Sequence, residues 1–311
     1  MNTDHVSDAL GAADDDGRWA FGTGLDAGST EEILAAEVTA PVPAGVDAAD
    51  LAAYALMLGD DALVAAQRLA GWVTHAPELE EEVALANIAL DLLGQARTLL
   101  SRAGHLGAAA PWRTAALAQA TADEDVLASF RDERAFRNVV LVETDLGDFG
   151  RTTAWLLVLA TWRLGLMERL RASRDPGIAA VAARAVPELA YHREYAVSWV
   201  LRLGDGTAES HRRMQAGLDA VWPFVEELVT THPLERALAD AGVAADPAAV
   251  RADLDAVLDR VLPAATLTRP ERAPVGLIGG RSGRDGVHTE ALGPVLALMQ
   301  SLARAHPAAT W

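Results

Sequence analysis

After residue 47, apolar residues recur at intervals of three to four positions along most of the chain, the spacing of one face of an α-helix. Asp47 or Asp50 is suited to cap the first such segment, and Pro77 is suited to open the second. Long helices are expected over about 48–74, 77–104, 149–173, 176–203 and 207–231, and shorter ones over 123–143, 234–241, 247–262 and 289–306. The pattern contains no convincing strand alternation, so the chain is predicted to be all-α.

The connections between the long predicted helices are short, which favours antiparallel neighbours in a bundle. Residues 48–311 are therefore expected to form one helical domain, with additional C-terminal helices after the bundle. Residues 1–47 contain ten acidic residues and one basic residue and follow no steady period. An acidic, disordered tail is expected there.

Composition excludes several kinds of chemistry. The chain has no Cys, and its 26 basic residues are all Arg, so thiolate metal sites, Cys nucleophiles and Lys Schiff bases are ruled out. A net charge of −18 argues against nucleic-acid binding. No secretory leader is recognisable, and the apolar run at 152–162 is too short to span a bilayer. A cytoplasmic protein without a nucleic-acid or membrane partner is expected.

Polar residues interrupt one face of the apolar helix predicted over 77–104. This face carries Asn87, Asp91, Gly94 and Thr98 at positions i, i+4, i+7 and i+11. An acid inside such a helix is costly unless it is paired or binds a metal, so Asp91 needs a partner. A structural network with an Arg or His of a facing helix meets this need, and so does a metal or substrate role.

A diiron helical bundle needs a carboxylate in each of two helices and a Glu-x-x-His pair in each of the other two. Here Asp91 is followed three residues later by Gly94, which has no ligating atom. The residue three before His192 is Leu189, and the third long helix has no acid over residues 151–167. The metal positions are thus degenerate, and no metal site is assigned to this chain.

Two other arrangements stay open at this level. An aspartate of the first helix, Asp60 or Asp61, could pair with Arg68, cap a neighbour, or complete a loose single-ion site together with Asp91 and His192. Glu188 and His192 share a helix face at i, i+4, which suits either a mononuclear site or a polar ladder with Arg184. The favoured interpretation is a ferritin-like bundle whose diiron site has been lost.

Several long stretches carry a resemblance to a known family. They are YALMLGDDALVAAQRLAGWVTHAPELEEEVALANIALDLLGQAR at 54–97, FRDERAFRNVVLVE at 130–143, SRDP at 173–176, YHREY at 191–195, LRLGDGT at 201–207, GVHTEALGPVLALMQ at 286–300 and the terminal Trp311. On these residues the chain resembles the structural C subunit of bacterial phenylacetyl-CoA epoxidases over about residues 50–311. The tail 1–47 and the Ala-rich stretch 105–120 lie outside this likeness.

The resemblance implies a ferritin-like bundle with no cofactor of its own. It also implies a homologous catalytic A subunit that carries a diiron site and the thioester, a small subunit, and a reductase with flavin and iron–sulfur groups. That complex uses oxygen and NADPH to make a ring epoxide of phenylacetyl-CoA. The chain is accordingly expected to be a non-catalytic structural subunit of a cytoplasmic hetero-oligomer in aerobic phenylacetate degradation.

A Gly-rich loop over 263–287 contains four Arg residues, among them Arg281 and Arg284. Guanidinium groups and exposed backbone N–H groups suit phosphates. Because coenzyme A carries phosphates, Arg281 and Arg284 are candidate contacts to the CoA of the partner's substrate. A solvated loop or a docking surface would explain the same composition.

Three functions are compatible with these residues. The first is an inert interaction partner of a diiron monooxygenase. The second is a self-sufficient metal-dependent oxygenase or hydrolase that uses Asp91 and His192. The third is an unrelated helical scaffold. The incomplete ligand set favours the first, with no catalytic residue assigned to this chain.

Overall fold

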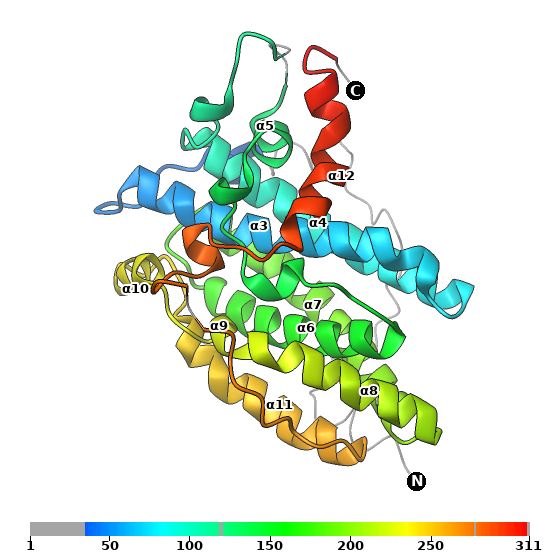
Figure 1. Ribbon diagram of the computed structural model, residues 1–311. Helices are drawn as coiled ribbons and strands as arrows, with labels where there is room; N and C mark the ends of the chain where they lie inside the picture. Colours follow the sequence, from blue (N-terminus) through cyan, green and yellow to red (C-terminus); the bar gives the residue numbers. More distant parts are fainter. Residues whose placement is uncertain (1–34, 118–120, 277, 310–311) are drawn as a thin grey trace, which may run out of the picture. The chain divides into compact units, whose positions relative to one another are not determined.

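Two helical hairpins make up the bundle in the computed structural model, which describes residues 35–117, 121–276 and 278–309 (Figure 1). The first hairpin pairs α3 (Ala48–Trp72) with α4 (Leu79–His105), and the second pairs α6 (Phe149–Leu170) with α7 (Pro176–Gly204). The hairpins meet where α4 packs on α7. The described residues form helices and no extended strand, and the predicted all-α, ferritin-like fold is confirmed.

Side-chain caps fix the starts of these helices close to their predicted positions. The Asp47 carboxylate accepts hydrogen bonds from the backbone N–H groups of Ala49 and Asp50 at the start of α3. Asp148 caps α6 and Asp175 caps α7 in the same way. Each cap satisfies backbone donors that have no partner within the helix, which is why these boundaries can be predicted from the local sequence.

The segment 123–143 is less helical than predicted. Its α-helix, α5, covers only Asp123–Ser129, and two short 3₁₀ turns follow at Glu133–Ala135 and Val140–Glu143. Buried carboxylates of α3 explain the difference, because they accept the backbone N–H groups of this segment. Asp60 accepts from Arg137 N at 2.9 Å, and Asp61 accepts from Val139 N at 2.8 Å.

Two smaller helices, α8 (Ala208–Val221) and α11 (Arg251–Ala264), pack on the second hairpin (Figure 1). Between them in the chain lie α9 (Val225–Leu228) and α10 (Pro233–Asp240), of which α10 packs on α3. The predicted helix over 207–231 is divided into α8 and α9 by a 3₁₀ turn that contains Pro223. Pro cannot donate a backbone hydrogen bond, so it ends the regular helix. The last helix, α12 (Leu292–Ala305), packs on α3 and α5.

Helix α6 lies at the centre of this arrangement and contacts α7, α8 and α11. Trp155 and Trp162 are fully buried in it. Gly217 allows α8 to approach closely, since a Cβ at this position would lie 2.6 Å from the Arg151 Cα. A helix enclosed in this way can carry a charged side chain only if the surrounding elements provide hydrogen-bond or ion-pair partners for that side chain.

The compact unit that holds the bundle begins at Glu37, earlier than the predicted domain start at residue 48. Arg102 donates to the Val38 carbonyl at 2.9 Å, and Arg174 donates to the Ala44 carbonyl at 3.0 Å. The predicted tail therefore extended too far, because residues 37–47 pack on the bundle. The rest of the predicted tail, up to residue 34, lies outside the described residues.

Candidate functional site

Arg163 places a charge inside the bundle. It lies in α6, and its side chain is fully buried. Its Nε donates to Gln95 Oε1 at 3.0 Å, and both Nη groups donate to the Leu58 carbonyl at 3.4 and 3.3 Å. Burial lowers the pKa of Arg163 to about 10, which leaves the guanidinium charged at neutral pH. Helix α6 thus carries a buried positive charge, whereas the corresponding helix of a diiron bundle supplies a carboxylate ligand to the metal.

Gln95 of α4 connects Arg163 to Glu188 of α7. Its Oε1 accepts from Arg163, and its Nε2 donates to Glu188 Oε2 at 2.9 Å. Burial raises the pKa of Glu188 to about 7, the nearby Asp91 carboxylate adds to the rise, and the hydrogen bond from Gln95 opposes it. Glu188 is therefore partly protonated near neutral pH.

His192 and Asp91 form a second pair, with His192 Nε2 2.9 Å from Asp91 Oδ2. The His192 side chain is 1% exposed, whereas that of Asp91 is 36% exposed. Burial lowers the pKa of His192 despite the hydrogen bond to Asp91, so the imidazole is neutral at neutral pH. Of the partners expected for Asp91, an Arg or a His of a facing helix, the structure shows a His, but the expectation that Asp91 is buried is wrong.

These five side chains form what we call the central polar cluster: Asp91, Gln95, Arg163, Glu188 and His192. It contains two carboxyl groups, one neutral imidazole, one amide and one guanidinium. That donor set does not fit a diiron centre, which needs four carboxylates and two imidazoles. Within the described part of the chain, no three His, Asp or Glu side chains are arranged to hold a metal ion.

Gly94 and Leu189 occupy the two positions where the diiron pattern lacks a ligand. Gly94 lies on the exposed side of α4, and a Cβ there would meet no atom within 4 Å. Leu189 is buried in the core. On α4, the residue that joins Asp91 in the cluster is Gln95, at i+4 rather than at i+3.

Gln95 and Arg163 were not singled out from the sequence. For Arg163 a signal exists, because it is the lone charge between Arg151 and Met167 in an apolar helix, and a buried cation needs acceptors. Gln95 offers no comparable signal, since a single amide in α4 could equally face solvent.

Replacing Glu188 by Gln is expected to change how stability depends on pH. The folded protein raises the pKa of Glu188 from 4.5 to about 7, so the folded state holds this proton more tightly than the unfolded state. Through this group the protein loses stability as pH rises from about 5 to about 7. The Glu188→Gln variant lacks this loss. The free energy of unfolding of the variant minus that of the wild type should therefore increase as pH rises, and level off above the pKa of Glu188 in the folded protein.

Urea denaturation at acidic and at mildly alkaline pH measures this difference. Glu194→Gln is the matched control, because Glu194 is exposed on the same helix. A difference between Glu188→Gln and wild type that is the same at both pH values would contradict the prediction.

A second polar assembly, the buried ion network, joins α3 to two loops. Arg131 forms an ion pair with Asp60, with Nη1 3.0 Å from Oδ2. Arg284 forms a bidentate pair with Asp61, with both Nη atoms 2.9 Å from the carboxylate oxygens. All four side chains are at most 5% exposed. The two aspartates are thus engaged in structural ion pairs, and the charge of Asp61 also favours the charged form of Arg163 in the central polar cluster.

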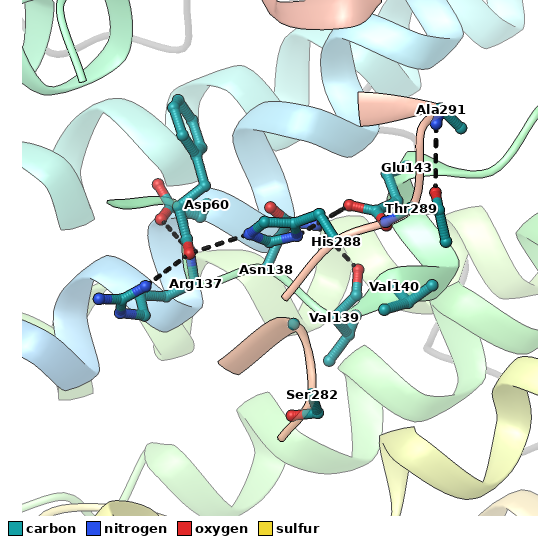
Figure 2. Close-up of polar contacts among 12 residues, drawn as sticks. Asp60, Arg137, Asn138, Val139, Val140, Glu143, Ser282, His288, Thr289 and Ala291 are labelled. Carbon is teal, nitrogen blue, oxygen red and sulfur yellow. Dashed lines mark hydrogen bonds and ion pairs between the residues drawn. The ribbon is translucent and has the colours of Figure 1, made fainter. Parts of the chain in front are cut away.

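Glu143 and His288 extend the buried ion network (Figure 2). Glu143 accepts from His288 Nδ1 at 2.9 Å, from Thr289 N at 2.7 Å and from Asn138 Nδ2 at 3.2 Å. His288 Nε2 lies 3.1 Å from the Phe136 carbonyl. Burial opposes protonation, but the hydrogen bond and charge of Glu143 outweigh it and raise the pKa of His288. With an acceptor on each ring nitrogen, His288 suits the imidazolium form, which locks two loops together.

Arg284 is part of this network, and its placement argues against the predicted contact with a CoA phosphate. Besides Asp61, it donates to the carbonyls of Met57 at 3.1 Å and Arg137 at 2.9 Å. Its donors are therefore used inside the protein. Arg281 is exposed and donates to the Asp285 carbonyl at 2.8 Å. For Arg281 the phosphate contact stays a prediction.

Helix α4 is the one helix in the described ranges that is long and apolar enough to cross a membrane. Half of its most apolar stretch is buried inside the protein, as in the core helices of folded bundles. Length and composition alone therefore do not indicate a span.

The profile of the family described as Phenylacetic acid catabolic protein matches residues 39–311. The chain belongs to this family. It is also 42% identical over 261 residues to the C subunit of 1,2-phenylacetyl-CoA epoxidase from Escherichia coli (strain K12). The match covers 84% of this chain and 99% of that relative. The predicted resemblance to the epoxidase C subunit is confirmed.

The stretches that carry the family resemblance supply most of the buried ion network. Asp60 and Asp61 belong to the stretch at 54–97, and Arg131 and Glu143 belong to the stretch at 130–143. His288 comes from the stretch at 286–300. In this chain these charged residues therefore position loops around the bundle.

Proposed function

We propose that this chain is a structural subunit of a multicomponent phenylacetyl-CoA epoxidase and supports a separate diiron catalytic subunit in aerobic phenylacetate degradation. The observation that carries the proposal is Arg163, a guanidinium held inside the bundle by Gln95 and the Leu58 carbonyl. The similarity to a protein named as the C subunit of such an epoxidase supports the same role.

Electrostatics explains why Arg163 disfavours a catalytic metal in this chain. At an effective dielectric constant of about 20, two unit charges about 4 Å apart interact by about 4 kcal/mol. Divalent ions beside a buried guanidinium would be repelled more strongly than this. The central polar cluster satisfies its own hydrogen bonds, so it is suited to hold α4, α6 and α7 in place without a metal.

The proposed complex is cytoplasmic and hetero-oligomeric. Its other components are the diiron catalytic subunit, a small subunit, and a reductase with flavin and iron–sulfur groups. The iron and the chemistry on the CoA thioester belong to the catalytic subunit, and this chain contributes no cofactor. Its part is to present a rigid helical surface on which the catalytic bundle is held.

Co-expression with the catalytic subunit tests this proposal. The two chains are expected to elute together from a size-exclusion column, with iron following the catalytic subunit. The isolated chain is expected to bind no stoichiometric iron. Separate elution at micromolar concentration would contradict the structural role.

The same preparation tests the alternative of a self-sufficient metal-dependent oxygenase or hydrolase. That function predicts about two irons, or one tightly bound ion, in the isolated chain. It also predicts loss of the metal when His192 is replaced by Ala.

A further inference from the structure

Three arginines beside the buried ion network lie around the loop at Asp285 and Gly286. Arg281 Nη2 donates to the Asp285 carbonyl at 2.8 Å, and Arg137 Nη1 donates to the Arg134 carbonyl at 2.8 Å. Gly286 packs directly on the second pair, since a Cβ at this position would lie 2.6 Å from Arg137 Nη1. The three arginines therefore gather at one short loop, and we call them the surface arginine cluster.

The charges of the surface arginine cluster are not neutralised by ion pairs. Across the described ranges, no carboxylate forms an ion pair with Arg134, Arg137 or Arg281, and the guanidinium groups of the last two donate to carbonyls. Arg134 and Arg281 are exposed, and Arg137 is half-buried. Figure 2 shows the Arg137 guanidinium at the edge of the residues drawn, away from Glu143. Burial lowers the pKa of Arg137, and the positive charge of Arg281 adds to this fall, so the two groups are near enough to repel each other.

The two acids that act on Arg137 are engaged with other partners. Asp60 forms its ion pair with Arg131, and Asp285 Oδ1 lies 3.2 Å from His232 Nε2. An excess of positive charge therefore remains at this part of the surface. The whole chain carries a net charge of −18 and repels anions, so an anion that binds here is held by the local cluster alone.

A tight hairpin presents Arg281 next to an apolar side chain. Ile278 and Arg281 exchange two backbone hydrogen bonds of 3.1 and 3.2 Å. Gly279 and Gly280 form the turn with φ of 62° and 79°, which glycine adopts without strain. Residues that are paired in this way place their side chains on the same face of the hairpin. Ile278 is 68% exposed, so it offers an open apolar contact beside the Arg281 guanidinium.

We propose that Arg134, Arg137 and Arg281 bind the phosphate group of an organic phosphomonoester. Such a group carries about −1.5 to −2 charges at neutral pH and three acceptor oxygens, which matches several guanidinium forks. A carboxylate has one charge and two oxygens and would leave donors of the cluster unused. Ile278 packs against the organic part of the ligand. This binding site goes beyond the proposed structural role and does not depend on the catalytic subunit.

Titration calorimetry of the isolated full chain with AMP at neutral pH and low ionic strength tests the site. Low ionic strength is needed because salt screens exposed charges. AMP is expected to bind one to one, and adenosine, which lacks the phosphate, is not expected to bind. Inorganic phosphate is expected to bind more weakly than AMP, because it cannot contact Ile278. No binding of AMP would overturn the proposal. Equal affinities for AMP and inorganic phosphate would also overturn it and assign the cluster to free phosphate.

Single substitutions locate the site. Arg134→Met and Arg281→Met are each expected to raise the Kd for AMP about tenfold, the ratio that the loss of a charge-assisted hydrogen bond gives. Ile278→Ser is expected to raise the Kd for AMP and to leave that for inorganic phosphate unchanged. Arg171→Met is the matched control, because Arg171 is an exposed arginine at the end of α6, and its Kd should equal that of the wild type. Equal losses in Arg171→Met and Arg281→Met would show that only the net charge of the chain matters, which would overturn the proposal.

Discussion

Replacing Asp61 by Asn is expected to lower the free energy of unfolding by about 3–5 kcal/mol. Asp61 holds both Nη groups of Arg284 at 2.9 Å, and both side chains are at most 5% exposed. Removing one partner of a buried ion pair leaves the other charge uncompensated in a medium that solvates it poorly. Glu235 is the nearest other acid, with its Oε1 3.9 Å from Arg284 Nε, too far to replace a bidentate pair.

Equilibrium unfolding in urea at neutral pH measures this loss. Asp253→Asn is the matched control, because Asp253 pairs with Arg169 at the surface, where the two side chains are 49% and 33% exposed. An exposed pair contributes about 1 kcal/mol or less. If both variants lost the same free energy of unfolding, burial would not determine how much the pair of Asp61 and Arg284 contributes to stability.

Replacing Arg102 by Met is expected to cost a similar amount and to loosen the segment that precedes α3. Arg102 is 1% exposed, lies 2.6 Å from Asp175 Oδ2 and donates to the Val38 carbonyl at 2.9 Å. Asp175 caps α7 by accepting from Ile178 N at 2.9 Å. One guanidinium therefore ties together α4, the start of α7 and the entry to the bundle, and its removal should cost about 3–5 kcal/mol.

Hydrogen–deuterium exchange distinguishes this variant from a general loss of stability. Peptides over 38–47 should exchange faster in Arg102→Met, under conditions where α6 keeps its wild-type protection. Arg212→Met, at a 66% exposed position, is the control with the same chemical change. Unchanged exchange over 38–47 would show that Arg102 does not hold this segment.

The central polar cluster and the buried ion network supply partners for the buried charges of this bundle from the chain itself. In the cluster, Arg163 supplies the positive charge. Gln95 accepts a hydrogen bond from Arg163 and donates one to Glu188. In the network, Asp60 and Asp61 neutralise arginines from distant loops. Each of these buried donors then has an acceptor, which rigidifies the core and sets the loops in a fixed geometry.

The sequence by itself determined the helices and much of the site's chemistry. Caps and prolines act within one turn, so the starts expected near 48, 149 and 176 agree with those of α3, α6 and α7, which the structure shows capped by Asp47, Asp148 and Asp175. The degenerate positions Gly94 and Leu189 could likewise be recognised, because ligand spacing on a single helix is a local property. The family resemblance required only contiguous stretches of residues.

The tertiary structure alone decided which groups meet. Asp60 and Arg131 are 71 residues apart in the chain, and Asp61 and Arg284 are 223 apart, distances over which periodicity carries no information. Asp60 and Asp61 also accept hydrogen bonds from the backbone of Arg137 and Val139, so the helix predicted over this segment does not form. The largely apolar sequence of α4 indicated a helix inside the bundle, yet one of its faces is open and exposes part of Asp91. A hydrophobic pattern records that a face is apolar, and only packing decides whether this chain or another one covers it.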